Sequence, residues 1–464
     1  MLSPHPKPPR RQASKSFRIG KVRAYLRSQV WYLCYREHGR RRQPRVGPDR
    51  ESAQQMAAEI NAQLEVGLPS ALGFQPISIP ELQQRWLDHH EHVRRSSVRT
   101  IERYRAATNH LLRFVGETRP IRRVSDFRPG HAEEFVRYLR SLKVAPNGHP
   151  NAAKRRLRDN SVKYILETCS TLMNYAQRQR HLSPYAENPF RTIDISRIPI
   201  EDPKPIIVFL PEQEQRFFEA CDDWQFPLFL LLLLTGLRPG ELTHLLLPED
   251  LDLSGGWLRV GNKPGLGWRV KTRTARDIPL HPVLVNVLNR AIGDRKSGPV
   301  FRQRRCCNGF VPPLADLSAA QLQYEATRRV ADLERLTSGE VSRREKQDVA
   351  RTVWRDMGAI REEWVRIEFM RVTKEIGMAE VTAPKTFRHT FATILQDGNV
   401  DPLIRNELMG HSPASSFGSG GGLGTTGLYT HTQPATKRRQ LEAALRDRPA
   451  LACATDWLAR KPKG

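Results

Sequence analysis

The sequence predicts three folded parts along the chain: a small β-sheet with one helix, an all-α bundle, and a mixed α/β domain that is mainly helical. Three observations lead to this prediction. Apolar residues alternate near the N-terminus, they recur at helical spacing further on, and two segments rich in proline divide the chain. At about 100–200 residues per domain, a chain of 464 residues also suggests several domains rather than one.

The first folded part is expected over residues 17–67. It follows residues 1–16, which are basic and rich in proline and are therefore expected to form a disordered arm. Alternating apolar residues predict a hairpin sheet of two or three strands that turns at Ser28 and Gln29. Asp49 is then expected to cap a helix, so the module reads as a sheet covered by one helix.

The second part, residues 77–192, follows a linker that contains glycine and proline. Ser78 and Glu81 have the spacing of a capping box at the start of its first helix, and Ser97 opens a second helix. Two more helical patterns follow, the last of them long and surrounded by Arg and Lys. We therefore expect a basic helical bundle.

The third part, residues 206–464, is expected to mix helices with short strands. The strands are predicted at residues 257–260, 269–272 and 277–280. Residues 302–380 are unusually charged and favour helix, so we interpret them partly as an insertion into this domain.

The net charge points to a nucleic-acid partner. The chain has 75 Lys and Arg residues against 49 Asp and Glu residues, a formal net charge of +26. Such a surplus predicts either phosphate backbones or an anionic membrane as partner. The membrane is the weaker alternative, because the longest apolar run, residues 226–234, is shorter than the roughly 20 residues of a spanning helix and no signal-peptide pattern opens the chain. We expect an intracellular protein of the bacterial cytoplasm that binds double-stranded DNA.

The six cysteines indicate no special chemistry. They are scattered, without CxxC pairs and without histidines at zinc spacing. Neither a disulfide framework nor a metal site is predicted from them, so the expected chemistry uses no metal and no cofactor.

Five short motifs follow one another in the third part of the chain. They are TGLRPGELTHL (235–245), VKTRTARDIPL (270–280), KTFRHTFATIL (385–395), ELMGHS (407–412) and LYTH (428–431). In this order they resemble the catalytic boxes of the tyrosine recombinase, or phage integrase, family. The resemblance implies a catalytic domain at 206–464, a helical core-binding domain at 77–192 and an arm-type DNA-binding domain at 17–67.

The first and third motifs supply two arginines suited to phosphate. Breaking a phosphodiester without metal requires a nucleophile, proton donors, and a cationic environment for the transition state. Arg238 and Arg388 offer planar guanidinium groups that can hold phosphate oxygens with two hydrogen bonds each. The resemblance makes them the two catalytic arginines of the family. Glu241, three residues after Arg238, is expected to orient that guanidinium.

The resemblance also implies the nucleophile and the general acid. Tyr429 corresponds to the tyrosine that becomes linked to DNA, and its phenol needs cationic neighbours because its ordinary pKa is about 10. Lys271 corresponds to the lysine that protonates the leaving 5′-oxygen. Lys263 and Arg273 are nearby alternatives to it.

One residue and one interval depart from the family pattern. His411 matches the late His or Trp that contacts the scissile phosphate, but Lys385 stands where the family usually has His. Lysine can donate to phosphate, yet it is a poorer general base. The interval from His411 to Tyr429 is about twice the usual one and contains a flexible glycine-rich loop, residues 417–427. His389 is expected to be structural.

The resemblance implies site-specific recombination through a 3′-phosphotyrosine intermediate, for integration or excision of a mobile element. It further implies a homotetramer on DNA and an accessory DNA-bending or directionality factor. A basic helix predicted at residues 433–445 corresponds to one that packs onto a neighbouring protomer in the family. The alternatives are a catalytically impaired DNA-binding regulator and an activity like that of type IB topoisomerases.

Overall fold

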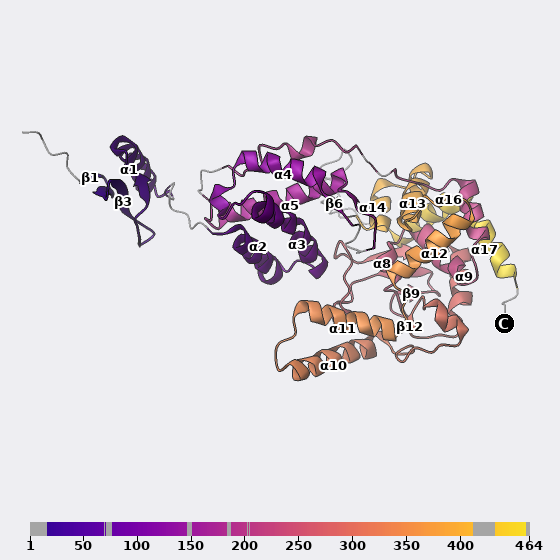
Figure 1. The fold of residues 1–464 in the computed structure, drawn as a ribbon. Helices are drawn as coiled ribbons and strands as arrows, with labels where there is room; N and C mark the ends of the chain where they lie inside the picture. Colours follow the sequence, from indigo (N-terminus) through magenta and orange to yellow (C-terminus); the bar gives the residue numbers. More distant parts are fainter. Residues whose placement is uncertain are drawn as a thin grey trace, which may run out of the picture. The chain divides into compact units, whose positions relative to one another are not determined.

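The computed structural model in Figure 1 describes most of the chain. The described residues are 16–68, 70, 77–145, 151–182, 187–201, 203, 205–411 and 432–460. Tyr429, the glycine-rich loop at 417–427 and all of the expected N-terminal arm except Ser16 lie outside them. The chain divides into two compact units, with the boundary between residues 204 and 205, and each is described by itself.

The first unit begins with an antiparallel sheet and one helix. The strands run in the order β1-β2-β3-β4, with β5 also paired to β3. The predicted turn at Ser28 and Gln29 is confirmed, since both have positive φ (48° and 64°), as a tight two-residue hairpin turn requires. The predicted cap is also confirmed, because the Asp49 carboxylate accepts from the backbone N–H of Glu51 and Ser52. The elements are β1 (Ser16–Ile19), β2 (Val22–Arg27), β3 (Val30–Glu37), β4 (Arg40–Arg42), β5 (Arg45–Gly47) and α1 (Arg50–Glu65).

One face of this sheet packs on α1 and the other stays open. The inward residues of β2 and β3 alternate with outward ones and form a small core with α1, which holds Val22, Ala24, Trp31, Leu33, Tyr35, Ala53, Ala57 and Ile60. The sheet has five strands, more than the hairpin pattern predicted, because the short β4 and β5 both pair with β3.

The helical bundle that follows has its own core. The predicted N-caps are confirmed: the Ser78 hydroxyl accepts from Glu81 N and the Ser97 hydroxyl accepts from Thr100 N. The helices surround a cluster that includes the fully buried Trp86, Phe114 and Phe135. The elements are α2 (Ile79–Asp88), η1 (His89–Val93), α3 (Val98–Arg113), η2 (Phe114–Thr118), η3 (Val124–Asp126), α4 (Pro129–Ser141), β6 (Lys143–Val144), β7 (Arg155–Arg156), α5 (Asp159–Arg178) and η5 (Ile195–Arg197).

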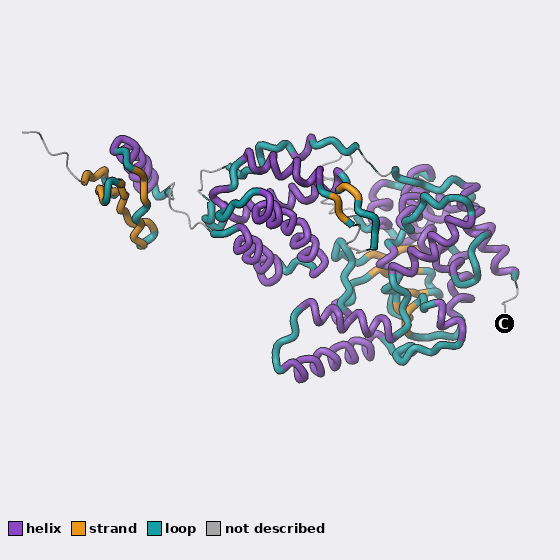
Figure 2. Tube along the Cα trace, viewed as in Figure 1, coloured by secondary structure: helices purple, strands orange, loops and turns teal. Residues whose placement is uncertain are grey.

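The second unit is mainly helical, with short strands (Figure 2). Its sheets are small, with the orders β11-β10-β9 and β12-β8. The elements are α6 (Pro211–Glu219), α7 (Gln225–Thr235), α8 (Pro239–Leu242), β8 (Leu246–Leu247), β9 (Leu251–Asp252), β10 (Trp257–Val260), η6 (Pro264–Leu266), β11 (Arg276–Pro279), α9 (Pro282–Ile292), β12 (Gly298–Pro299), η7 (Arg304–Asn308), α10 (Ala319–Thr337), α11 (Arg343–Asp356), α12 (Glu362–Glu375), α13 (Lys385–Asp397), α14 (Pro402–Met409), α16 (Pro434–Leu445) and α17 (Pro449–Ala459). The multidomain fold class is confirmed: a sheet-plus-helix module, a helical bundle and a mainly helical mixed domain.

Helix α7 is the centre of the second unit. Every one of its residues is buried, because α9 and α13 pack against it. A helix that is apolar on all sides is stable only when neighbours cover it all round. It has 11 residues, and none of the helices in the described ranges combines the length and apolar character needed to cross a membrane.

The strand predicted at residues 269–272 is wrong. The chain there makes turns, and β11 begins only at Arg276. The reason lies in the backbone: Gly267 and Arg273 both have positive φ (66° and 61°), which interrupts an extended strand on either side of the predicted segment.

The charged segment 302–380 divides between two cores. Helices α10 and α11 form a hairpin that Figure 1 shows projecting from the rest of this unit. They share a small separate core that includes Leu322, Ala326, Val353 and Trp354. By contrast, α12 is part of the main core, with its apolar side chains buried there.

Two helices close the second unit at its C-terminal side. The predicted basic helix is present as α16, and its apolar residues Leu441 and Leu445 are buried in the main core of the same chain. That α16 also packs onto a neighbouring protomer, as the resemblance implies, stays a prediction. Helix α17, which the sequence patterns did not predict, packs on α6 and α9, and its Trp457 ring stacks on Phe226 at 5.4 Å between centroids.

Candidate active site

Arg238 lies at a sharp turn between α7 and α8. Gly236 ends α7 in the left-handed conformation, and a Cβ atom there would lie 2.3 Å from the Phe391 ring, so only glycine fits. Arg238 is then the N-cap of α8, and Glu241 binds it twice: Glu241 Oε2 accepts from Arg238 N at 3.0 Å and Oε1 accepts from Arg238 Nη1 at 2.7 Å. The predicted orienting role of Glu241 thus has a direct contact behind it.

Arg276 is a member of this site that the sequence patterns did not identify. It is buried at the start of β11, and its guanidinium donates to both oxygens of Glu241, at 2.7 Å and 3.2 Å. Its Nε donates to the Leu408 carbonyl at 3.0 Å. Glu241 therefore lies between two arginines. Burial raises the pKa of Glu241, but the hydrogen bonds and charges of Arg276 and Arg238 outweigh it and leave this pKa below its ordinary value.

Arg388 lies on α13 and is almost fully buried. Its Nη1 donates to the Gly236 carbonyl at 2.6 Å, and its Nη2 donates to the Met409 carbonyl. These carbonyls come from the ends of α7 and α14, so three helices meet at this guanidinium. Burial, and then the nearby charge of Arg238, lower the pKa of Arg388 to about 10, although Glu241 opposes this effect.

His411 follows α14 directly and contacts Arg388. Gly410 turns the chain with a φ of 61°, and His411 Nε2 then lies 3.4 Å from Arg388 Nη2. Burial lowers the pKa of His411, and the charges of Arg388, Arg238 and Arg276 lower it further. At neutral pH this imidazole is therefore mainly uncharged.

Positive charge exceeds negative charge among these groups. Two guanidinium groups contact one carboxylate and a third, that of Arg388, lies near them; burial, and then the cationic neighbours, lower the pKa values of Arg388 and His411. An anion placed among them would relieve this repulsion, and the guanidinium groups are already oriented by their acceptors. The arrangement is that of a preorganised anion site.

Lys271 lies apart from these contacts, on an exposed turn that precedes β11. The Asn262 side chain closes this turn, because its Oδ1 accepts from Val270 N at 2.9 Å and its Nδ2 donates to the Arg273 carbonyl at 2.8 Å. The rival Lys263 is already engaged: its Nζ lies 2.7 Å from Asp250 Oδ2, and both side chains are largely buried.

Lys385 is the first residue of α13 and is exposed. It precedes Arg388 by three residues, so the two side chains share one side of the helix. His389 is partly buried, and burial together with the charges of Lys385 and Arg388 lowers its pKa. The structure therefore brings Arg238, Glu241, Arg388 and His411 together and leaves both lysines outside their contacts.

Tyr429 lies outside the described residues, but the chain on both sides of that interval is described. On one side, α14 leads to His411. On the other, Lys437 of α16 pairs with Glu407 of α14, with Nζ and Oε2 2.8 Å apart, and the Thr432 hydroxyl donates to Glu407 Oε1 at 3.4 Å. The helices before and after this interval are thus joined to each other.

The phage integrase family model matches residues 208–434, the interval that contains Arg238, Glu241, Lys271, Arg276, Lys385, Arg388 and His411. Residues 208–434 are a phage integrase family domain. A search among curated proteins finds no match. The integrase domain accordingly spans the site from Arg238 to the helix that follows Thr432.

Three solved integrases are similar to this chain at low identity. The Tn1549 transposon integrase in complex with a circular intermediate DNA is 18% identical, with 79% of this chain and 99% of that chain covered and a TM-score of 0.46. The lambda integrase dimer bound to a core site is 14% identical, with coverage of 88% and 94% and a TM-score of 0.47. The integrase from mycobacterium phage Brujita is 18% identical, with coverage of 81% and 97% and a TM-score of 0.33.

Outside the integrase domain, the open face of the N-terminal sheet is basic and aromatic. Arg23 and Arg27 on β2 point away from α1, and so does Arg36 on β3, and all three are exposed. Between them Tyr25 and Tyr32 stack across the two strands, with ring centroids 5.8 Å apart. Such a face offers cations to phosphates and flat rings to sugars or bases.

Proposed function

We propose that this chain is a site-specific DNA recombinase that cuts and rejoins DNA through a covalent bond at Tyr429. The observation that carries the proposal is the buried excess of positive charge formed by Arg238, Arg276 and Arg388 around Glu241. A phosphodiester that gains negative charge in its transition state is the ligand this arrangement stabilises best, because the donors are fixed before it arrives.

In the proposed reaction, the Tyr429 oxygen attacks the scissile phosphorus and the bond to the 5′-oxygen breaks. Lys271 gives a proton to that leaving oxygen, and the phenol proton passes to a base at the site. A 3′-phosphotyrosine and a free 5′-hydroxyl result. The 5′-hydroxyl of a second strand then reverses the step. One phosphoester replaces another, so the reaction requires no nucleotide cofactor.

The remaining site residues have supporting roles in this proposal. Arg238 and Arg388 hold the non-bridging oxygens, while Glu241 and Arg276 fix Arg238 in place. His411 has a lowered pKa, so its neutral ring can either accept or donate a proton at the phosphate. Lys385 contacts phosphate as a cation.

The other parts of the chain are proposed to bind DNA. We assign arm-site binding to residues 17–67, whose open sheet face carries exposed arginines, and core-site binding to residues 77–192. The active form would be a homotetramer that integrates or excises a mobile element, assisted by a DNA-bending or directionality factor. This role would place the protein in the cytoplasm, at the chromosome.

A covalent-trapping experiment tests the nucleophile. The substrate is a nicked duplex that carries the direct repeats expected to bound the element, and the adduct is followed on a denaturing gel and by peptide mapping. Wild-type protein should form an adduct at Tyr429, and Tyr429→Phe should bind DNA equally well but form none. Tyr324→Phe is a matched control, because Tyr324 is exposed on α10, and it should behave as wild type.

Three results would contradict the proposal. An adduct that persists in Tyr429→Phe, or that maps to another tyrosine, would show that the nucleophile is misassigned. Specific binding to the repeats without any adduct in wild type would favour a DNA-binding regulator. Relaxation of supercoiled plasmid without strand exchange would favour an activity of the type IB topoisomerase kind.

A further inference from the structure

The α10–α11 hairpin packs on the loop that carries Lys271. This loop, residues 261–275, joins β10 to β11 and is called the β10–β11 loop below. Of its apolar residues, Val270 is buried in the main core, whereas Leu266 and Trp268 do not join that core. They join the small core that the hairpin forms, together with Trp354 and other side chains of α10 and α11.

The contacts between hairpin and loop are close. The Trp354 indole Nε1 of α11 donates to the Leu266 carbonyl at 2.9 Å, and this hydrogen bond is buried. Two glycines let the loop approach the helices: a Cβ atom on Gly267 would lie 2.7 Å from the Ala350 Cβ, and one on Gly265 would lie 2.4 Å from Gln323. A side chain on Gly267, whose φ is also positive, would therefore force the loop away from α11.

The same core also contacts the turn that carries Arg238. The Trp268 ring stacks on His244 with centroids 3.7 Å apart and an angle of 8° between the rings, and Trp354 meets His244 edge-on at 4.5 Å. His244 Nδ1 in turn lies 2.7 Å from the Gly240 carbonyl, two residues after Arg238. Trp354 and His244 thus connect the β10–β11 loop to the arginine turn.

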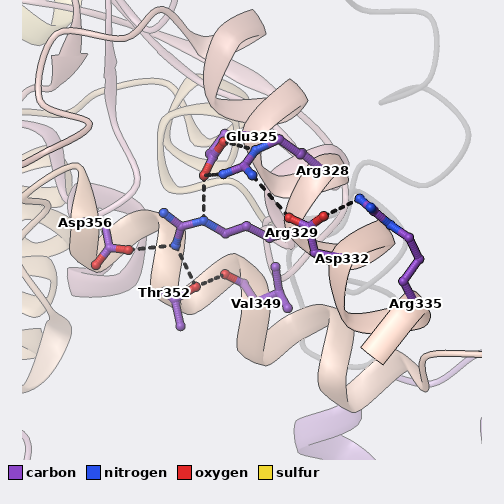
Figure 3. A network of polar contacts seen from close by, with 8 residues as sticks. All are labelled: Glu325, Arg328, Arg329, Asp332, Arg335, Val349, Thr352 and Asp356. Carbon is purple, nitrogen blue, oxygen red and sulfur yellow. Dashed lines mark hydrogen bonds and ion pairs between the residues drawn. The ribbon is translucent and has the colours of Figure 1, made fainter. Parts of the chain in front are cut away.

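The hairpin is itself held together by an ion-pair network (Figure 3). Arg329 of α10 donates to Asp356 of α11 at 2.7 Å and to the Thr352 hydroxyl at 3.1 Å. Its Nε donates to Glu325 on its own helix at 2.8 Å. Since these bonds cross between α10 and α11, the two helices present Gln323, Ala350 and Trp354 to the loop as one surface.

Beyond the contacts with the hairpin, the loop continues directly into the Lys271 turn. Lys263 and Trp268 bond to each other through both backbone groups at 3.0 Å, and Asn262 then closes the turn from Val270 to Arg273. The position of Lys271 therefore depends on a loop that is held by the hairpin at residues 265–268, by Asn262, and by Val270, which is buried in the main core.

We propose that the α10–α11 hairpin is a brace that positions the Lys271 turn for proton donation, with Trp354 as its positioning residue. This inference rests on the proposed function, in which Lys271 protonates the leaving 5′-oxygen. It assigns a role in the chemistry to a hairpin that contains none of the catalytic motifs.

A pair of substrates separates positioning of the acid from general structural damage. One is the nicked duplex described above. The other carries sulfur in place of the bridging 5′-oxygen, and its thiolate leaves without needing a proton. Trp354→Phe keeps an aromatic ring but removes the indole donor and part of the ring that packs on the loop. It should cleave the oxygen substrate about tenfold more slowly, part of the 10²–10⁴-fold that a positioned proton donor contributes, and cleave the sulfur substrate at the wild-type rate.

Two further variants guard this test. Ala350→Val adds bulk to the hairpin side of the Gly267 contact, so it should give the same loss, confined to the oxygen substrate, if Trp354→Phe folds poorly. Trp364→Phe makes the same chemical change at an exposed position of α12 and should match wild type on both substrates. Thermal unfolding and DNA binding are measured alongside for each protein.

The possible results distinguish failure of the brace from failure of the proposed function. If wild type cleaves both substrates while Trp354→Phe and Ala350→Val lose activity equally on both, or lose none, the brace is wrong although the recombinase remains. If Lys271→Ala gains nothing from the sulfur substrate, Lys271 is not the acid and the brace loses its target. If wild type cleaves neither substrate, the proposed function fails and the brace fails with it.

Discussion

Arg388 in the candidate active site and Arg329 in the α10–α11 hairpin differ in the groups that accept their hydrogen bonds. Arg388 donates to two backbone carbonyls and lies near two further arginines. Arg329 donates to the carboxylates of Glu325 and Asp356 and to one hydroxyl (Figure 3). Among the residues that the structure describes, no carboxylate is hydrogen-bonded to Arg388, so its positive charge is not balanced by its hydrogen-bond partners. The positive charge of Arg329 is balanced by the two carboxylates that accept its hydrogen bonds.

This difference explains why counting arginines does not locate a phosphate site. The hairpin is rich in arginine, yet carboxylates accompany them along both helices. Most of the pairs within one helix involve solvent-exposed arginines and contribute little to stability, whereas the partly buried pair of Arg329 with Asp356 joins the two helices. In the candidate active site the arginines are more buried and Glu241 is the carboxylate that pairs with two of them, so a bound anion would be stabilised there.

The largest effect on the rate of DNA cleavage should come from replacing Arg388 by alanine, with Arg329→Ala as the comparison. Arg388→Ala should slow DNA cleavage by about 10²–10³-fold, or roughly 3–4 kcal/mol, because one preorganised charged donor is lost from the transition state. Arg329→Ala should slow cleavage far less, by no more than the roughly tenfold expected when the brace on the Lys271 turn is loosened, because Arg329 acts on the site only through the hairpin. Single-turnover cleavage of the nicked duplex measures both. Equal losses would remove the distinction between the two regions.

Removing the charge of Glu241 should destabilise the protein more than removing the charge of Glu325. Glu241→Gln removes the charge between Arg238 and Arg276, and we expect it to lower the free energy of unfolding by about 3 kcal/mol, the low end for breaking a buried ion pair. Glu325→Gln, its counterpart in the hairpin, should cost less than about 1 kcal/mol. Urea unfolding of the two variants beside wild type gives both values. A smaller loss for Glu241→Gln than for Glu325→Gln would reverse the comparison.

His244, at the border between the two regions, should make stability depend on pH. Burial lowers its pKa to about 4, whereas the unfolded chain has the ordinary value near 6.5. Between these two pKa values, His244 is therefore protonated in the unfolded state but not in the folded state. The stabilisation is complete above pH 6.5 and is lost as the pH falls toward 4, by about 2–3 kcal/mol at pH 4.5.

The pH effect is measured by urea unfolding at pH 7 and pH 4.5. His244→Gln should be less stable at neutral pH but should lose about 2–3 kcal/mol less than wild type on acidification. His92→Gln provides the control, because His92 is exposed on η1 and lies outside the stack. An identical pH dependence in wild type and His244→Gln would show that the buried ring is not the source.

Substitutions of Lys385 measure how much an exposed cation contributes to DNA cleavage in addition to the buried arginines. Its amine is exposed, so we expect phosphate contact rather than essential base catalysis. Lys385→Ala should lose about tenfold in cleavage, within the range for a single charged hydrogen bond, and Lys385→His should lose less. The same single-turnover assay compares them. Near-complete loss in both variants would mean that the lysine acts in a way that histidine cannot replace.

The sequence predicted the fold class and most of the local signals. Caps at Asp49, Ser78 and Ser97 and the turn at Ser28 were predicted because each depends on a few adjacent residues. Local chemistry of this kind is readable without knowing the tertiary structure. Only one predicted strand is wrong, and there the left-handed backbone at Gly267 and Arg273 prevails over the pattern.

The site was predictable only in part. Arg238, Arg388 and Glu241 were found from motif order, and their contacts agree with the expected grouping, while the catalytic roles themselves stay predictions. Arg276 was missed, because only a weak signal in its neighbourhood indicates that β11 turns its guanidinium inward onto Glu241. Its alternation with Ile278 on β11, two residues apart and both buried, was the one available signal.

The contact between α6 and α17 has a consequence for the order of events in the cell. Glu214 on α6 is fully buried, and its partners, Arg448 and the backbone N–H of Ala450, lie at the start of α17. The ribosome synthesises α6 before α17. More than two hundred residues must therefore be added after Glu214 before its partners are present in the chain. A nascent chain can fold its N-terminal module and helical bundle early, but it cannot complete the domain that would cut DNA until translation has passed α17.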